Sequence, residues 1–318
     1  MIITDYNRFG EKKMKKNRII SLITAVILIC AALCSCGGGG ETTQSTASDT
    51  DKSAATTEKS ATVQPAGEGD VTIVFITAGK ADSILLMTGG KNYMIDTGEK
   101  GKESFKLTDK ILKVYSITKI EGVFLSHDHS DHSGGLKRLA GSYEVGCVYS
   151  AALHTSEDNI AETTNELGLK HELLSAGDRF TISEAVYFDI LAPLDLDYSR
   201  ENNNSMVMML NANGKKILFT GDMEFPEEAT LLDSGANIKA DILKVANHGN
   251  PDASSSRFLK AVSPEYAVIT TDRSVDEDSA NTAVITTLPD TKFYITDEYK
   301  LGVFFTISKN GVISVETK

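Results

Sequence analysis

The apolar residues of this chain predict short strands and helices that alternate from Val71 to the C-terminus. Short apolar runs bounded by polar or glycine residues are typical of buried strands, and Phe105–Tyr115 shows the spacing of one helix face. We expect strands at 71–77, 83–87, 92–95, 120–125, 144–150, 172–175, 179–182, 186–192, 205–211, 215–220, 240–245, 266–270, 293–295, 303–308 and 311–315. We expect helices at 105–115, 157–167, 224–232, 254–262 and 281–288.

This order predicts an α/β fold. The strands form two β-rich halves, and each half contains its own helices. Two sheets with flanking helices satisfy such a pattern, because each sheet then buries one face against its partner and the other under helices. Residues 71–318 are enough for one large domain of this kind.

The N-terminus has the pattern of a secretory signal. Basic residues between Lys12 and Arg18 precede the apolar run Ile19–Leu33, which is shorter than the roughly 20 residues of a membrane span. The segment Leu33–Cys36 resembles a bacterial lipobox, which implies cleavage before Cys36 and a diacylglycerol on its sulfur. We predict a lipoprotein signal peptide at 1–36, with an uncleaved anchor helix as the alternative. In both cases we expect the rest of the chain to lie on the extracellular face of the cytoplasmic membrane. This membrane is therefore its predicted partner.

Residues 37–70 are predicted to form a flexible linker. They are rich in Gly, Ser, Thr, Ala and Glu and nearly devoid of large apolar side chains. Such a segment cannot bury enough apolar surface to offset the entropy of ordering. The chain therefore divides into 1–36, 37–70 and a globular domain at 71–318.

The charge of the chain disfavours one class of partner. The full chain has a net charge of −12, and without residues 1–36 it retains 26 Lys/Arg against 42 Asp/Glu, a net charge of −16. Binding to duplex DNA depends on neutralising phosphates with Lys and Arg, so duplex DNA is an unfavourable partner. Cys147 lies in an apolar run, and we expect it to be buried rather than to bind a metal.

The strongest chemical signal is the motif His-x-His-x-Asp-His at 127–132. Three of the six histidines of the chain lie in it, directly after the predicted strand at 120–125. Imidazole and carboxylate together suit a borderline divalent ion such as zinc. Gly134 and Gly135 follow and permit a tight turn. The alternative, a polar loop that is rich in His and Asp by chance, does not explain this context.

Three other predicted strands end at a residue that can bind a metal. These residues are Asp96, Asp222 and His248, and each lies beside a glycine or one residue from it. Each has a simpler alternative: Asp222 as the N-cap of the next helix, Asp96 as an ordinary turn residue and His248 as an ordinary polar histidine.

Together these residues resemble the metallo-β-lactamase superfamily, and within it the soluble hydrolase domain of ComEC-type DNA-uptake proteins. The histidine motif carries the superfamily resemblance, while Asn204-Ser205 and the Leu-Lys-Val-x-x-His-Gly segment at 243–249 carry the subfamily resemblance. The matching segments are 71–82, 94–98, 125–136, 176–179, 203–210, 218–222, 241–249 and 263–270. The resemblance implies a four-layer αββα sandwich at 71–318.

The resemblance also implies a centre of two divalent ions, zinc or manganese. By motif, His127 and His129 would hold the first ion, and Asp131, His132 and His248 the second. Asp222 would bridge both ions, so that Asp131 and Asp222 are the predicted catalytic carboxylates. Two ions 3.5–4 Å apart can share and activate a hydroxide. Asp96 would orient an imidazole, and Asn247 is predicted to lie beside the ligands.

The chain departs from the family pattern at several positions. Asn247 stands where relatives usually have a histidine, and an amide cannot carry a proton. Thr77, Lys80 and Ala81 replace residues common in relatives, whereas Gly79 and Asp82 keep the pattern. A late Gly-His-Pro has no counterpart near 276–280, and for a third histidine at the first ion only His154 offers itself, although we expect it to be a surface residue.

Two functions follow as expectations. The first is an extracellular, lipid-anchored, metal-dependent hydrolase that cleaves phosphoesters, either small molecules or single-stranded nucleic acid. The second is a metal-binding lipoprotein that captures a ligand or partner without turnover, because the outer parts of the site are reduced.

Overall fold

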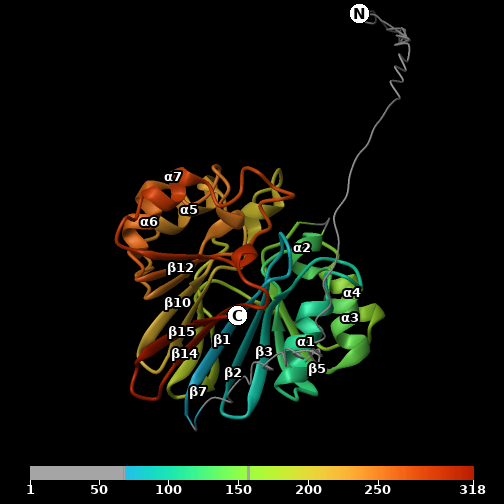
Figure 1. Cartoon of the computed structure of the whole chain (residues 1–318). Coiled ribbons are helices and arrows are strands. Elements are labelled where there is room, and N and C mark those ends of the chain that lie inside the picture. The colour runs from blue at the N-terminus through green and yellow to red at the C-terminus, as the bar shows by residue number, and fades with distance from the viewer. Residues whose placement is uncertain (1–66, 68, 156–157) are drawn as a thin grey trace, which may run out of the picture. The chain divides into compact units, whose positions relative to one another are not determined.

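The computed structural model describes residues 67, 69–155 and 158–318, and these form two packed β-sheets covered by helices (Figure 1). The first sheet has the strand order β15-β14-β1-β2-β3-β4-β5-β6. Its strands are β1 (Val71–Ile76), β2 (Ser83–Thr88), β3 (Lys91–Thr97), β4 (Lys119–Phe124), β5 (Glu144–Ala151), β6 (His171–Leu174), β14 (Gly302–Ile307) and β15 (Ile313–Thr317).

The second sheet has the strand order β13-β12-β11-β10-β9-β8-β7. Its strands are β7 (Arg179–Ser183), β8 (Val186–Ile190), β9 (Met208–Ala212), β10 (Lys215–Phe219), β11 (Ile242–Lys244), β12 (Tyr266–Ile269) and β13 (Lys292–Ile295). The helices are α1 (Lys106–Val114), α2 (Ser130–Ser133), α3 (Leu136–Ser142), α4 (Ile160–Glu166), α5 (Phe225–Asp233), α6 (Ser256–Val262) and α7 (Thr282–Thr286), with single 3₁₀ turns η1 (Glu201–Asn204), η2 (Ala246–Gly249) and η3 (Thr296–Glu298).

The two sheets and the helices on their outer faces form four layers, and three buried apolar clusters fill the spaces between these layers. The central cluster joins the inner faces of the two sheets, where the ring of Phe124 on β4 lies 4.8 Å from that of Phe188 on β8. Burial of such a side chain stabilises the fold by roughly 1.5–3 kcal/mol. A second cluster packs α1, α3 and α4 onto the first sheet, and a third packs α5, α6 and α7 onto the second. The predicted αββα sandwich is therefore confirmed.

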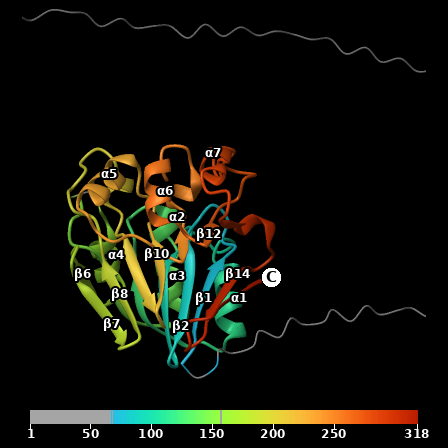
Figure 2. The ribbon, with the colours of Figure 1, turned by 90° about the vertical axis from the view of Figure 1, so that its left-hand side faces the viewer.

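Each sheet has a parallel half. The carboxyl ends of the parallel strands of both sheets lie at the same end of the sandwich. Strands β3 to β6 pair in parallel, as do β10 to β13. Ligands in α/β folds bind beyond the carboxyl ends of parallel strands, because the loops there meet. Helix α2 lies toward this end of the sandwich (Figure 2). The loops after β10 and β11 begin at the same end, because these two strands pair in parallel.

The predicted elements agree closely with the structure, and the main difference has a physical reason. The strand expected at 205–211 begins only at Met208, because the residues before it turn toward the histidine motif. There the N–H of Met206 donates to Ser126 O at 2.8 Å, and Ser205 Oγ accepts from the N–H of Asp222 at 3.0 Å. This short segment thus connects the two halves instead of extending the sheet.

The predicted signal peptide, Cys36 and nearly all of the predicted linker lie outside the described residues, so these remain predictions. Within the described part of the chain, no helix is both long enough and apolar enough to cross a membrane. Cys147 is buried and unpaired, as expected.

Candidate metal centre

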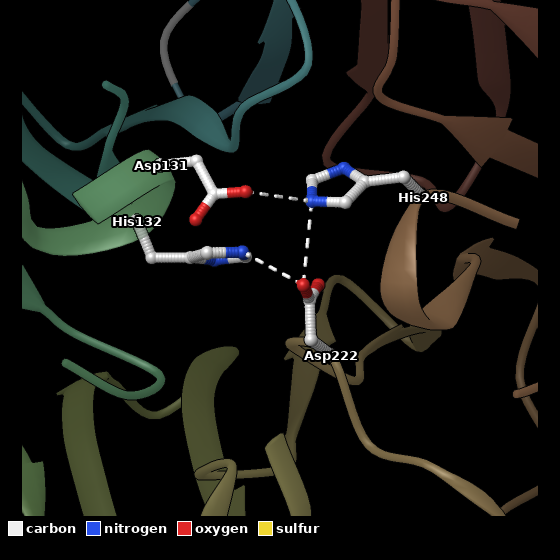
Figure 3. Close-up of side chains that lie close together, drawn as sticks. All are labelled: Asp131, His132, Asp222 and His248. Carbon is white, nitrogen blue, oxygen red and sulfur yellow. Dashed lines mark ion pairs between the residues drawn. The ribbon is translucent and has the colours of Figure 1, made fainter. Parts of the chain in front are cut away.

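Four predicted ligands from three separate loops converge on one point (Figure 3). Asp131 and His132 lie on α2, Asp222 follows β10, and His248 lies in η2 after β11. One ligand atom of each lies within 4.8 Å of the others. The Nε2 atoms of His132 and His248 lie 3.2 and 3.3 Å from Oδ2 of Asp222, and His248 Nε2 lies 3.3 Å from Oδ2 of Asp131.

The other ring nitrogen of each histidine is held by a fixed acceptor. Nδ1 of His132 lies 2.9 Å from Oδ2 of Asp96, and Nδ1 of His248 lies 2.6 Å from the carbonyl oxygen of Thr270. An acceptor at Nδ1 fixes the proton there, which leaves the lone pair of Nε2 directed at the convergence point. The predicted orienting role of Asp96 thus has a geometric basis.

These residues fit a divalent cation. Both Nε2 atoms are buried, and neither has a hydrogen-bond partner among the residues that the structure describes. Buried polar atoms are nearly always hydrogen-bonded, so two converging imidazole nitrogens that make no hydrogen bond and face carboxylate oxygens fit the binding of a divalent cation. Two imidazoles and two carboxylates are a common ligand set of zinc and of other first-row metals.

The electrostatics of the site favour positive charge. Burial by itself lowers the pKa of His248, but the carboxylates of Asp222 and Asp131 raise it to about 9. The pKa of His132 is raised well above its usual value, because Asp222 and Asp96 outweigh the opposing effect of burial. In the metal-free chain these imidazoles therefore hold protons, and binding of a metal ion would release them.

His127 and His129 form a separate pair beside this group. His127 Nε2 lies 3.0 Å from His129 Nδ1, and the ring of His127 lies 4.3 Å from that of His132. Two nitrogens that each bind one ion at about 2.1 Å, at a right angle, would lie about 3.0 Å apart. Within the described residues, no other His, Cys, Asp or Glu completes a group of three with this pair. His154 instead contacts the carbonyl oxygen of Thr155 through Nδ1.

The backbone around the ligands is strained. Asp96, Asn247 and His248 have φ angles of 54°, 45° and 53°, a left-handed conformation that is costly for residues with a side chain. Gly221 also has a positive φ, of 50°, and a Cβ there would lie 2.8 Å from Ser205 Oγ and 2.9 Å from Ser126 Cβ. Only glycine lets the end of β10 approach the histidine motif so closely.

The start of α5 decides the N-cap alternative for Asp222, and hydrogen bonds define the surroundings of Asn247. Helix α5 begins after Glu224, so Asp222 is not its N-cap. The side chain of Asn247 donates to Asp252 at 3.1 Å, and its backbone N–H donates to Gly221 O at 3.3 Å. Asn247 therefore contacts the neighbours of the ligands rather than the ligands themselves.

The structure adds two charged residues for which the sequence suggested no role. Asp82 and Lys244 are each 1% exposed, and the Lys244 ammonium lies 2.5 Å from Oδ2 of Asp82. Burial alone would lower the pKa of Lys244, but Asp82 and Asp222 raise it, so the ammonium stays charged. The signal that could have identified Lys244 is its position in an otherwise apolar strand.

Lys80, one of the departures from the family pattern, lies at the edge of the site. Its ammonium is 3.9 Å from Oδ2 of Asp131 and 3.5 Å from Oδ2 of Asp276. The loop at 276–280 still packs on the metal centre, because the N–H of Ala280 donates to the carbonyl oxygen of His248 at 3.0 Å.

A two-sheet sandwich with a His/Asp cluster at the carboxyl ends of its parallel strands defines a class of metal-binding hydrolases. The chain belongs to the metallo-beta-lactamase superfamily, whose family model matches residues 76–271. Members of this superfamily are generally metal-dependent hydrolases and usually bind divalent metal ions.

Curated relatives agree with the predicted ComEC-like resemblance. The chain is 27% identical to ComE operon protein 3 of Bacillus subtilis over 221 residues, which is 64% of this chain and 28% of that protein. It is 28% identical to Competence protein ComA of Neisseria gonorrhoeae over 202 residues, 63% of this chain and 27% of that protein. The chain thus spans little more than a quarter of these relatives' length.

Solved structures include the metallo-beta-lactamase fold protein YhfI from Bacillus subtilis. It aligns with a TM-score of 0.49 and 14% identity, over 78% of this chain and all of YhfI. A diphosphatase of the PhnP family aligns with a TM-score of 0.45 and 12% identity, over 78% of this chain and 97% of the other.

Proposed function

We propose that this chain is a metal-dependent hydrolase of phosphoesters that is anchored by lipid outside the cytoplasmic membrane. The observation that carries the proposal is the convergence of the unpartnered Nε2 atoms of His132 and His248 on the carboxylates of Asp131 and Asp222. A site with this ligand set, when two divalent ions are bound, activates water and neutralises the charge of a phosphoryl group.

The residues of the chain divide this work among them. Asp131, His132, Asp222 and His248 would hold one ion, and His127 with His129 would hold the other, with Asp222 between them. Asp96 and the Thr270 carbonyl keep the Nδ1 protons in place, so the imidazoles bind through Nε2 without rotating. His132, His248 and their Nδ1 acceptors are buried, which excludes bulk water from these contacts and thereby strengthens them.

The surroundings of the site favour a small or single-stranded substrate over duplex DNA. A cavity of about 320 Å³ opens beside His129 and is lined by the carboxylates of Asp128, Asp158, Asp197 and Glu201, with Arg200 as its basic residue. Such a lining repels a long polyanion, and the negative net charge of the whole chain has the same effect. A short phosphoester presents few charges to this lining.

The proposal is tested with the purified full chain, its metal content and two substrates. We expect about two ions per chain, zinc or manganese, and cleavage of bis-p-nitrophenyl phosphate or of a single-stranded oligonucleotide when these ions are supplied. His132→Ala, His129→Ala and Asp131→Ala should each lower turnover by about 100-fold or more, because each removes a ligand.

His154→Ala is the matched control, since it removes a histidine near the same cavity that lies outside the ligand group, and it should retain wild-type turnover. A chain that binds two ions but cleaves neither substrate would contradict the proposal. It would instead support capture of a ligand without turnover, for which the absence of a third histidine at the His127–His129 pair is the specific argument.

A further inference from the structure

A buried cation lies directly behind the candidate metal centre. Lys244, the last residue of β11, is 1% exposed, and its ammonium contacts three oxygens. These are Asp82 Oδ2 at 2.5 Å, the carbonyl oxygen of Gly221 at 2.8 Å and Asp222 Oδ1 at 3.5 Å. Lysine is almost never fully buried unless it is paired, so this position needs a reason.

The two carboxylate oxygens of Asp222 have different neighbours. Oδ1 faces the ammonium, whereas Oδ2 faces the Nε2 atoms of His132 and His248 at 3.2 and 3.3 Å. The hydrogen bond to the Gly221 carbonyl places the ammonium one residue before Asp222, where the chain leaves β10. A carboxylate held on one side by a fixed cation cannot turn its other oxygen away from the ligand group without losing that contact.

Asp82 connects the ammonium to the rest of the centre. Its Oδ1 accepts from the hydroxyl of Thr270 and lies 3.9 Å from His248 Nδ1, and its Oδ2 lies 3.7 Å from His132 Nδ1. The pair of Asp82 and Lys244 is neutral as a unit, so it contributes contacts without adding net charge to the site.

We propose that Lys244 is a positioning residue that fixes Asp222 for metal binding, by holding Oδ1 so that Oδ2 faces the metal ions. This inference rests on the metal centre proposed above. The competing explanation is a structural role alone, in which Lys244 merely neutralises the buried carboxylate of Asp82.

Three variants separate the two explanations: K244M, D82N and the double variant D82N/K244M. The first measurement is the affinity of the full chain for Zn²⁺, by competition with a chromophoric chelator, and the second is the melting temperature of the metal-free chain. The double variant keeps the net charge of the site, since it removes one charge of each sign.

Breaking a buried ion pair is strongly destabilising, whereas replacing both partners by neutral residues is often tolerated. We therefore expect K244M to lower the melting temperature and D82N/K244M to recover most of that loss. Zn²⁺ affinity should remain about 10–100-fold below that of the wild type in both, because residues that orient metal ligands have effects of this size. A double variant with wild-type Zn²⁺ affinity would overturn the inference.

The order of Zn²⁺ affinity in the two single variants is a second test, which can be made even if the double variant does not fold. Loss of a positive charge near the metals should raise Zn²⁺ affinity on charge alone, and loss of the Asp82 carboxylate should lower it. A positioning role predicts the reverse order, in which K244M binds Zn²⁺ more weakly than D82N. The reason is that D82N keeps the Lys244 ammonium in contact with Asp222. Affinity in K244M equal to or greater than that in D82N would overturn the inference.

Glu228→Gln is the matched control for loss of a buried carboxylate, since Glu228 is 1% exposed and its carboxylate accepts from the backbone N–H of Ser255, the N-cap of α6. It should change the melting temperature without changing Zn²⁺ affinity. Wild-type chain that binds Zn²⁺ but cleaves no substrate would overturn the proposed function alone, because the affinity measurements still decide the role of Lys244.

Discussion

At the scale of single residues, this protein places charges where burial alone would exclude them. Asp82, Asp222, His132, His248 and Lys244 are all at most 3% exposed. Each is compensated by an opposite charge within 4 Å, so the centre is a network of coupled charges rather than a row of independent ligands. Single substitutions in such a network should have larger effects than substitutions of surface ion pairs.

Glu227 on α5 is a buried ionisable residue whose carboxyl oxygens have no hydrogen-bond partner within the described part of the chain. Burial raises its pKa well above the usual value of 4.5, so above that pH the unfolded chain loses this proton before the folded chain does. The folded state is therefore favoured less and less as pH rises toward the raised pKa, by up to about 1.4 kcal/mol per pH unit. Glu227→Gln should remove this contribution, which urea unfolding of both proteins at pH 5 and pH 8 would reveal. An equal change in stability for both would contradict it.

At the scale of elements, the short helix α2, which carries Asp131 and His132, packs closely against β3. A Cβ on Gly135, between α2 and α3, would lie 2.0 Å from the carbonyl oxygen of Thr97, while the hydroxyl of Thr97 donates to His132 O at 2.9 Å. The backbone at Gly135 thus lies directly against β3, and the Thr97 hydroxyl joins the same strand to the histidine motif.

Gly135→Ala should consequently displace α2 and weaken both the fold and metal binding. We expect a loss of about 1–3 kcal/mol in the free energy of unfolding, the usual cost of overpacking. Gly141→Ala in α3 is the matched control, because a Cβ there meets nothing within 4 Å and alanine favours a helix by about 0.5–1 kcal/mol. Chemical denaturation would measure both, and equal effects of the two variants would refute this packing argument.

Most elements could be predicted from the sequence, because apolar periodicity is a local property. The parallel halves end at Asp96, Asp222 and His248, as the pattern of strand ends indicated, and the histidine motif follows β4. The roles of Asp82 and Lys244 could not be predicted. The hydrogen bond from Thr270 to Asp82 joins residues 188 positions apart, and it exists only after both sheets have formed and packed.

At the scale of the whole molecule, the sequence predicts that an acidic globular domain is joined to a membrane anchor. Labelling with radioactive palmitate should modify the wild-type protein and not Cys36→Ser, since the lipobox resemblance assigns the lipid to that sulfur. Cys34→Ser is the matched control and should keep the label. Label retained by Cys36→Ser would contradict the predicted anchor.

The sequence by itself determined which residues could bind metal and that they would follow strands, because motif spacing and apolar periodicity are written in consecutive positions. Only the tertiary structure decided how these residues meet. It set the left-handed backbone at His248. It also directed one oxygen of Asp222 toward Lys244 and the other toward the Nε2 atoms of two imidazoles. These features depend on the closure of one sheet onto the other, which brings together charges that lie far apart along the chain.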